Sequence, residues 1–279
     1  MPIDKINNVN IFWELTGDKG EPLILVHGSW SDHHNWDSVT PELAKTFRVL
    51  TYDRRGHSQS ERPIGQGYVE EDITDLIELI NHFNLSPAHI VGNSYGAGIV
   101  LKTAAKRPDL FRSMIVHEPP FFGLLQDDPD AGEALQTVNA RMKAVLDLIA
   151  AGNIEKATEE FTEKIAMGPG AWEKVPDQVK NTFIYNALTW YDEMHDPQSL
   201  QIDITTLSAF KKPALLSTGS ESPPFFRPVI EKLMNALPHT KRITIEGAGH
   251  VPHRSHPEKY IELVKQFCLT GDVVLHRYN

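Results

Sequence analysis

Short apolar runs alternate with helical patterns over the first 120 residues of the chain. Within residues 71–83, apolar side chains recur at helical spacing, so we predict a helix that lays one apolar stripe on a sheet. A second helical stretch, residues 97–107, ends before Pro108. The apolar runs that we predict as strands are residues 10–16, 22–26, 47–52, 89–91 and 113–116. This alternation indicates a mostly parallel sheet, with ligands bound beyond the carboxyl ends of its strands.

The alternation of strands and helices stops after Pro119-Pro120, and only helical patterns follow up to residue 203. Strands and helices alternate again in the last part of the chain. The expected elements are helices at 141–150, 154–165 and 178–190, strands at 213–216 and 242–245, and helices at 229–236 and 257–269. We therefore predict an α/β core of residues 1–120 and 204–279 and a helical cap of residues 121–203 over the sheet's carboxyl edge.

The composition is that of an ordinary globular chain of 279 residues, with 41% hydrophobic and 23% charged residues. A formal net charge of −10 makes nucleic acid an unexpected partner, because phosphate binding requires a basic face. No apolar run approaches the roughly 18–20 residues that span a bilayer, so no membrane partner is expected. The N-terminus lacks the apolar core of a signal peptide, and Cys268 is the only cysteine. We expect a cytoplasmic protein, either a monomer or a homodimer.

The segment Gly92-Asn93-Ser94-Tyr95-Gly96 lies between a predicted strand and a predicted helix. A serine flanked by glycines at such a turn is typical of a nucleophile elbow, where small neighbours let the strand and the helix pass close together. A serine hydroxyl is a poor nucleophile at its free pKa and needs a base beside it. We take Ser94 as the candidate nucleophile.

His250 is the best candidate for that base. It lies in the glycine-rich loop Gly247-Ala248-Gly249-His250, after a predicted strand, and so reaches the sheet edge at which Ser94 emerges. His253 and His256 follow at intervals of three, but no recognised metal-ligand pattern accompanies them. We therefore expect no metal site and treat both as structural residues.

Two backbone amides are candidates for holding the negative charge that develops on an attacked carbonyl oxygen. One belongs to Tyr95, at the positive start of the helix after the nucleophile. The other belongs to Ser29, in the loop His27-Gly28-Ser29-Trp30 after the strand at residues 22–26. Each such donor contributes about 2.7–4 kcal/mol in a known hydrolase.

Together, His27-Gly28, the stretch Asp53-Arg54-Arg55-Gly56-His57-Ser58, the serine motif and Gly249-His250 resemble the α/β-hydrolase superfamily. The motifs occur in the superfamily's order and cover nearly the whole chain apart from the cap. The resemblance implies an eight-stranded, mostly parallel sheet and a Ser-acid-His triad. It also implies that the stretch from Asp53 to Ser58 is a structural turn without a catalytic role.

The acid of the triad departs from the usual pattern. In most members an aspartate follows the strand that begins here at Pro213, but Ser222 fills that position. Serine cannot supply the negative charge that stabilises an imidazolium. We favour Glu118, which ends a strand and is held by two prolines, and keep Glu221 as the alternative. The stretch His117-Glu118-Pro119 also resembles, locally, lactonases that open zearalenone.

Aromatic residues are frequent in the loops at the predicted sheet edge and in the cap. Their density favours an apolar or aromatic small molecule as the binding partner. The candidate substrate contacts are Trp30, Phe121, Phe122, Trp172, Trp190 and Phe225.

These observations predict a serine hydrolase that cleaves a carboxylic ester or lactone through an acyl-enzyme, without a metal or organic cofactor. Two alternatives remain open. One is another chemistry on the same residues: carbon–carbon bond hydrolysis, cofactor-free oxygenation or peracid formation. The other is a small-molecule receptor with little turnover. Since fold does not determine substrate, the sequence does not choose the substrate.

Overall fold

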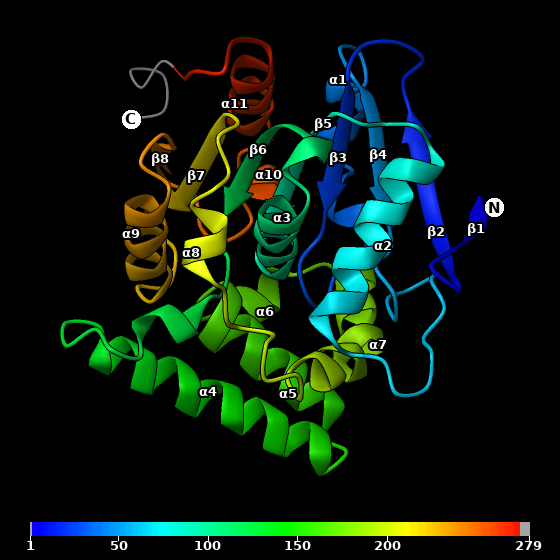
Figure 1. Cartoon of the computed structure of the whole chain (residues 1–279). Helices are drawn as coiled ribbons and strands as arrows, with labels where there is room; N and C mark the ends of the chain where they lie inside the picture. The colour runs from blue at the N-terminus through cyan, green and yellow to red at the C-terminus, as the bar shows by residue number, and fades with distance from the viewer. Residues whose placement is uncertain (1, 274–279) are drawn as a thin grey trace.

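The computed structural model describes residues 2–273 of the chain. Its centre is one eight-stranded sheet in the order β1-β2-β4-β3-β5-β6-β7-β8 (Figure 1). The strands are β1 (Ile3–Ile6), β2 (Val9–Thr16), β3 (Pro22–Val26), β4 (Arg48–Tyr52), β5 (Ala88–Asn93), β6 (Phe111–His117), β7 (Ala214–Gly219) and β8 (Lys241–Ile245). β2 pairs antiparallel with both β1 and β4, and the remaining pairs, from β4 to β8, are parallel. The predicted fold class is confirmed.

Helices cover both faces of the sheet and also fill the segment between β6 and β7. The helices are α1 (Thr40–Leu43), α2 (Val69–His82), α3 (Tyr95–Lys106), α4 (Gly132–Ala150), α5 (Ile154–Phe161), α6 (Ala171–Lys174), α7 (Asp177–Glu193), α8 (Ile204–Leu207), α9 (Phe226–Ala236), α10 (Pro252–Ser255) and α11 (Pro257–Thr270). Shorter turns are the 3-10 helices η1 (His33–Trp36), η2 (Pro108–Leu110) and η3 (Phe122–Leu125) and the π-helical turn η4 (Thr162–Ala166).

Two hydrophobic clusters lie on opposite faces of the sheet. In β3, Ile24 and Val26 belong to the cluster under α2, α3 and α9, while Leu23 and Leu25 belong to the cluster under α1 and α11. Successive side chains of a strand point to opposite faces, so a continuous apolar run serves both clusters. This is why the short runs in the sequence predicted buried strands.

Strand register brings the candidate residues to one edge of the sheet. Asn93 at the end of β5 pairs with His117 at the end of β6, and His117 pairs with Ser217 of β7. Ser94 and Glu118 therefore follow directly after paired residues. Ser94 and Glu118, more than twenty residues apart in the sequence, thus both lie at the carboxyl edge of the sheet, where such sheets bind ligands.

The segment of residues 121–203, hereafter the cap segment, contains helices and turns but no strand within the described residues. Figure 1 places α4, α5, α6 and α7 below the carboxyl ends of the strands, on the side opposite α1 and α11. The helix expected at 141–150 begins at Gly132, and the one expected at 154–165 changes to the π-helical turn at Thr162. Leu135 and Val138 already continue the apolar spacing of Met142 and Val145, so the predicted start was too late.

One strand was missed in the sequence. β1 is only four residues long, and Ile3 is 41% exposed, so it lacks the buried apolar run by which the other strands are recognised. Its pairing with β2 defines it.

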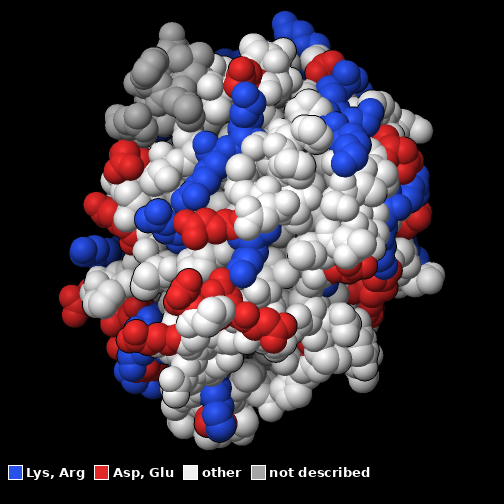
Figure 2. All heavy atoms as spheres, turned by 60° about the vertical axis from the view of Figure 1, so that its left-hand side comes forward, with Lys and Arg blue, Asp and Glu red and all other residues white. Residues whose placement is uncertain are grey.

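The surface carries charges of both signs. On the face shown in Figure 2, acidic and basic side chains are both spread over the surface among uncharged residues. In the described part of the chain, no helix combines the length and apolar character needed to cross a bilayer.

Candidate active site

Ser94 occupies a strained turn between β5 and α3. Its backbone has φ +54° and ψ −125°, a conformation that costs a non-glycine residue free energy and marks functional turns. A Cβ atom on Gly92 would lie 2.7 Å from the Cα of Ala97. A Cβ atom on Gly96 would collide with the carbonyl oxygen of Val26. The two glycines are therefore required for the close approach of helix and strands.

The structure joins His250 to Glu118. The two atoms His250 Nδ1 and Glu118 Oε2 are 2.6 Å apart, and the backbone N–H of Gly219 donates to Glu118 Oε1 at 2.9 Å. Asn93, next to Ser94, donates from its side chain to the carbonyl oxygen of His250. The alternative acid, Glu221, is exposed. Of the two glutamates, Glu118 has the geometry of an orienting carboxylate.

Glu118 is completely buried and has φ +49°, a second strained position at the sheet edge. Burial alone would raise its pKa, but the neighbouring His117 and His250 rings hold the pKa below the ordinary value of 4.5. Burial lowers the pKa of His117 to about 4, so this ring is neutral near pH 7. Glu118 is therefore ionised at neutral pH, as an acid that stabilises an imidazolium must be.

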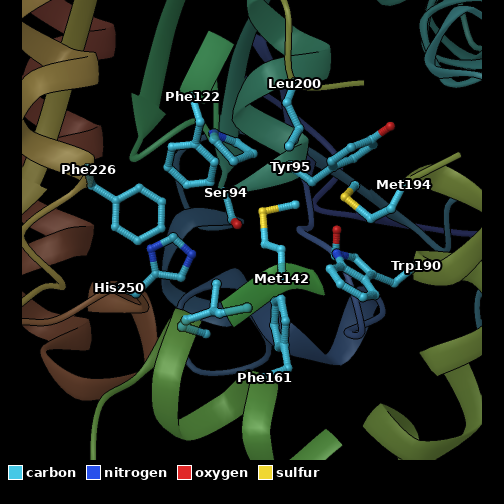
Figure 3. A pocket seen from close by; sticks show the side chains of 14 residues that line it. Ser94, Tyr95, Phe122, Met142, Phe161, Trp190, Met194, Leu200, Phe226 and His250 are labelled. Carbon is cyan, nitrogen blue, oxygen red and sulfur yellow. The ribbon is translucent and has the colours of Figure 1, made fainter. Parts of the chain in front are cut away.

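Ser94 and His250 line the same pocket, and Figure 3 shows both side chains among those that surround it. The His250 ring stacks on Phe226, with ring centroids 4.4 Å apart and an angle of 15° between the planes. Among the described residues, no hydrogen bond joins the Ser94 hydroxyl to His250.

The loop after β3 passes directly beside Ser94. A Cβ atom on Gly28 would lie 2.9 Å from the Cβ of Ser94, so only glycine fits there. Burial lowers the pKa of His27 to about 3, so its ring is neutral. Its Nδ1 then donates to the Gly28 carbonyl at 2.8 Å, and its Nε2 accepts from the Arg54 amide at 2.9 Å. This ring fixes the loop that presents Ser29 to the pocket.

The lining of the pocket is mostly apolar. Among the described residues, no Lys, Arg, Asp or Glu lines it. The core and the cap segment both contribute walls, as Figure 3 shows. The lining residues are Ser29, Ser94, Tyr95, Pro120, Phe122, Met142, Phe161, Ile165, Ala166, Trp190, Met194, Leu200, Phe226 and His250.

Of the six predicted substrate contacts, Phe122 and Trp190 line this pocket. The other four are not among the described lining residues: Trp30, Phe121, Trp172 and Phe225. They lie behind or beside its walls. Trp30 is completely buried and stacks on Phe161, and Phe225 packs edge-on against Phe122.

Phe121 packs toward Gly98, and Lys180 lies over the face of the Trp172 ring. Conversely, the sequence analysis missed Met142 of α4 and Phe161 of α5 as lining residues. Both helices were predicted, but the hydrophobic pattern does not say which face of a cap helix meets a pocket. Aromatic density is therefore a poor guide to direct contact.

Two groups of potential metal-ligating side chains occur in the described chain: His117, Glu118 and His250, and the buried cluster of Asp32, His33 and Asp53. The oxygens of Glu118 already accept hydrogen bonds from His250 and Gly219. Asp53 accepts from the backbone and ring of His33 through one oxygen. A metal at either place would have to displace these bonds.

A buried charge network beside the pocket was also missed. Arg54 is completely buried and binds Asp72 at 3.0 Å and Glu193 at 2.8 Å. Glu193 in turn accepts a hydrogen bond from the hydroxyl of Ser29. The partners are far apart in sequence, so no local motif marks them.

Comparison with known proteins is consistent with this geometry. The family model of the alpha/beta hydrolase fold matches residues 21–257. The chain is 26% identical over 253 residues to (E)-2-((N-methylformamido)methylene)succinate hydrolase of Acinetobacter baylyi. That alignment covers 90% of this chain and 92% of the relative. It is 25% identical over 264 residues to pimeloyl-[acyl-carrier protein] methyl ester esterase of Aeromonas hydrophila, covering 89% of this chain and 96% of the relative.

Among solved structures, an epoxide hydrolase of Bacillus megaterium superposes with a TM-score of 0.79 at 19% identity, covering 96% of this chain and all of that one. At this identity the likeness concerns the fold alone. The family model, by contrast, spans most of the chain and includes Ser94 and His250. The chain therefore belongs to the family of the alpha/beta hydrolase fold and is a hydrolase of that fold.

Proposed function

We propose that this protein is a serine hydrolase that cleaves a carboxylic ester or lactone of a small, uncharged, apolar molecule. The observation that carries the proposal is the shared pocket. A serine on a strained turn and a histidine held by a buried carboxylate face one apolar cavity. Nucleophile, base and orienting acid are the three groups that such a reaction requires, and here all three lie at one cavity or directly behind it.

In the proposed reaction, Ser94 Oγ attacks the carbonyl carbon while His250 Nε2 takes its proton. Glu118 holds Nδ1 and stabilises the imidazolium. The backbone amides of Ser29 and Tyr95 hold the oxyanion, since the first amides of a helix lack partners within it. His250 returns the proton to the leaving alcohol, and water then releases the acyl group from Ser94 by the same steps.

The missing hydrogen bond between Ser94 and His250 fits this proposal. Catalytic hydrogen bonds of free enzymes are often long and tighten only when substrate is bound. A rotation of the small Ser94 side chain about χ1 changes the position of its hydroxyl without moving the backbone of the turn.

The lining of the pocket supports an uncharged substrate. A carboxylate buried there would have no cationic partner among the described lining residues, and burying an unpaired charge is very unfavourable. One relative is named for a succinate and another for a methyl ester. Of the two, the ester is the better match to the pocket of this chain.

Labelling with a fluorophosphonate, combined with an activity screen, tests the proposal. The parent protein should be labelled and should hydrolyse p-nitrophenyl esters or lactones. Ser94→Ala should lose both, while the control Ser208→Ala, just after helix α8 and outside the pocket lining, should keep both. Unchanged ester hydrolysis by Ser94→Ala would refute the proposal.

The same screen separates the alternatives. Cleavage of β-diketones without ester hydrolysis would transfer the proposal to carbon–carbon bonds. Tight ligand binding by both the parent and Ser94→Ala, with no turnover, would favour a receptor.

A further inference from the structure

Ser29 and Tyr95, whose backbone amides are the proposed oxyanion donors, each form a side-chain hydrogen bond to the cap segment. The Ser29 hydroxyl donates to Glu193 Oε2 at 3.1 Å, at the end of α7. The Ser199 hydroxyl donates to the phenolic oxygen of Tyr95, also at 3.1 Å. The loop after β3 and the start of α3 therefore share a support that lies about a hundred residues or more away in sequence.

Glu193 is the centre of this support. Its side chain is 2% exposed, and its second oxygen, Oε1, accepts from Arg54 at 2.8 Å. Arg54 is fully buried, also binds Asp72, and lies 4.9 Å from the centre of the Tyr95 ring. One guanidinium therefore links Glu193 to α2 and lies over the residue that follows the nucleophile. Both oxygens of Glu193 act as acceptors, which is the pattern of an ionised carboxylate.

The groups that face Glu193 come from four elements. Arg54 and His57 follow β4, Asp72 belongs to α2, Tyr95 to α3, and Ser29 to the loop after β3. Burial raises the pKa of Glu193 to about 7, and the charge of Asp72 acts in the same direction. His57 is neutral, since burial holds its pKa well below its ordinary value. Near neutral pH, Arg54 is thus the cation available to Glu193.

The rest of α7 is tied to the same loops by buried polar bonds. Asn186 donates to the carbonyl oxygens of Trp30 at 3.2 Å and Ser31 at 3.0 Å, and accepts from the backbone N–H of Ser58 at 2.8 Å. Trp30 has φ +68°, so the loop is held in a conformation it would not keep without support. α7 is therefore a rigid brace on the loop that presents Ser29.

We propose that Glu193 is a positioning residue for oxyanion stabilisation: through the Ser29 hydroxyl and Arg54 it holds the two backbone donors in place from the cap segment. This inference rests on the proposed function. Backbone donors stabilise the transition state only when they are aimed at the developing oxyanion, and a shift of about 1 Å is enough to lower the rate by about a hundredfold. The apolar pocket wall does not involve Glu193. Its loss should therefore reduce kcat and leave KM nearly unchanged.

Glu193→Gln is the primary test variant, because the amide keeps the size of the side chain but cannot accept both hydrogen bonds. The matched control is Asp192→Asn, the preceding residue of α7, which breaks an exposed ion pair with Arg62. We expect fluorophosphonate labelling of Ser94 and kcat on an ester to fall by about tenfold or more in Glu193→Gln. Asp192→Asn should match the parent.

Ser29→Ala provides a second variant that does not disturb the buried charges. It removes the hydroxyl bound to Glu193 but keeps the backbone amide. We expect a smaller loss in kcat than in Glu193→Gln, and no further loss when the two changes are combined, because the Ser29 contact is one of the two that Glu193→Gln disturbs. Full labelling in folded Ser29→Ala, or losses that simply add, would overturn the inference.

The pH dependence adds a measurement that a merely structural role would not change. Protonation of Glu193 removes an acceptor, so the labelling rate of the parent should fall more steeply toward acid pH than the labelling rate of Glu193→Gln. Identical profiles would overturn the inference. If the parent is not labelled at all, it is the proposed function that fails.

Discussion

The two halves of the cap segment are held in place in different ways. α7 is bonded to the core by buried polar contacts from Asn186, Thr189 and Glu193. The described hydrogen bonds and ion pairs of α4, α5 and η4 instead join these elements to one another or to other parts of the cap segment. Both halves line the pocket, through Trp190 on one side and Met142 and Phe161 on the other.

The difference predicts which part of the cap segment moves more easily. Apolar packing is non-directional, so helices held by it can shift with modest loss, whereas buried polar groups must keep their partners. We therefore expect α7 to remain with the core and the α4–η4 half to open for substrate. Chemistry should then depend on the fixed parts of the molecule, and access and specificity on the other half.

The largest expected effect concerns Glu118, at the carboxyl edge of the sheet. Glu118→Gln should lower kcat by about 10⁴-fold, as in a comparable triad. The neutral amide cannot stabilise the positive charge that forms on His250, and it does not hold the ring in the correct tautomer and orientation. Steady-state kinetics on an ester measure this. Glu221→Gln is the control and should have little effect; the reverse result would assign the acid to Glu221.

Replacing the central anchor of α7 should give the next largest effect. Asn186→Ala leaves the partners at Trp30, Ser31 and Ser58 without a hydrogen bond, and we expect a loss of about 2–4 kcal/mol in unfolding free energy. Urea denaturation measures it. Asn181→Ala, at an exposed position of the same helix, should change stability by less than about 0.5 kcal/mol. Equal stabilities of the two variants would contradict the distinction between the halves.

A change in the α4–η4 half of the cap segment should alter substrate selectivity rather than the chemical step. Phe161→Ala removes a large side chain from the pocket wall and so enlarges the pocket. We therefore expect kcat/KM for bulky esters to rise about tenfold relative to kcat/KM for small esters, with little change in the labelling of Ser94. A series of esters of increasing acyl size measures this ratio. Phe161→Leu, which keeps most of the volume, is the control. A loss of labelling in Phe161→Ala alone would place this half in the chemical step.

The smallest effect concerns stability against pH. Glu193 has a raised pKa, so its favourable contribution is complete below the ordinary value of 4.5 and declines as pH rises to about 7. Glu118 has a lowered pKa, so its contribution is present above 4.5 and lost as pH falls. Thermal unfolding should show less decline between about pH 5 and 7 in Glu193→Gln than in the parent. A steeper decline would show that the sign is wrong.

The site was partly predictable because much of it consists of local motifs. The Ser94 turn needs glycines within two residues of the serine, and the strand end before His250 carries its own glycine-rich loop. The position of Glu118 after β6 was predictable from its prolines, and in the structure its Oε2 lies 2.6 Å from His250 Nδ1. Its role, like those of Ser94 and His250, remains a prediction that the variants above test.

Sequence alone determined the alternation of strands and helices, the parallel sheet and the order of the motifs, because these depend on side-chain periodicity and turn residues close together in the chain. Only the tertiary structure decided which residues line the pocket and that Glu193 meets Ser29 across 164 positions. A periodic pattern records that a helix buries one face, but the partner of that face depends on how distant segments pack. A buried ion pair has no periodicity, so it becomes visible only when its two ends are brought together.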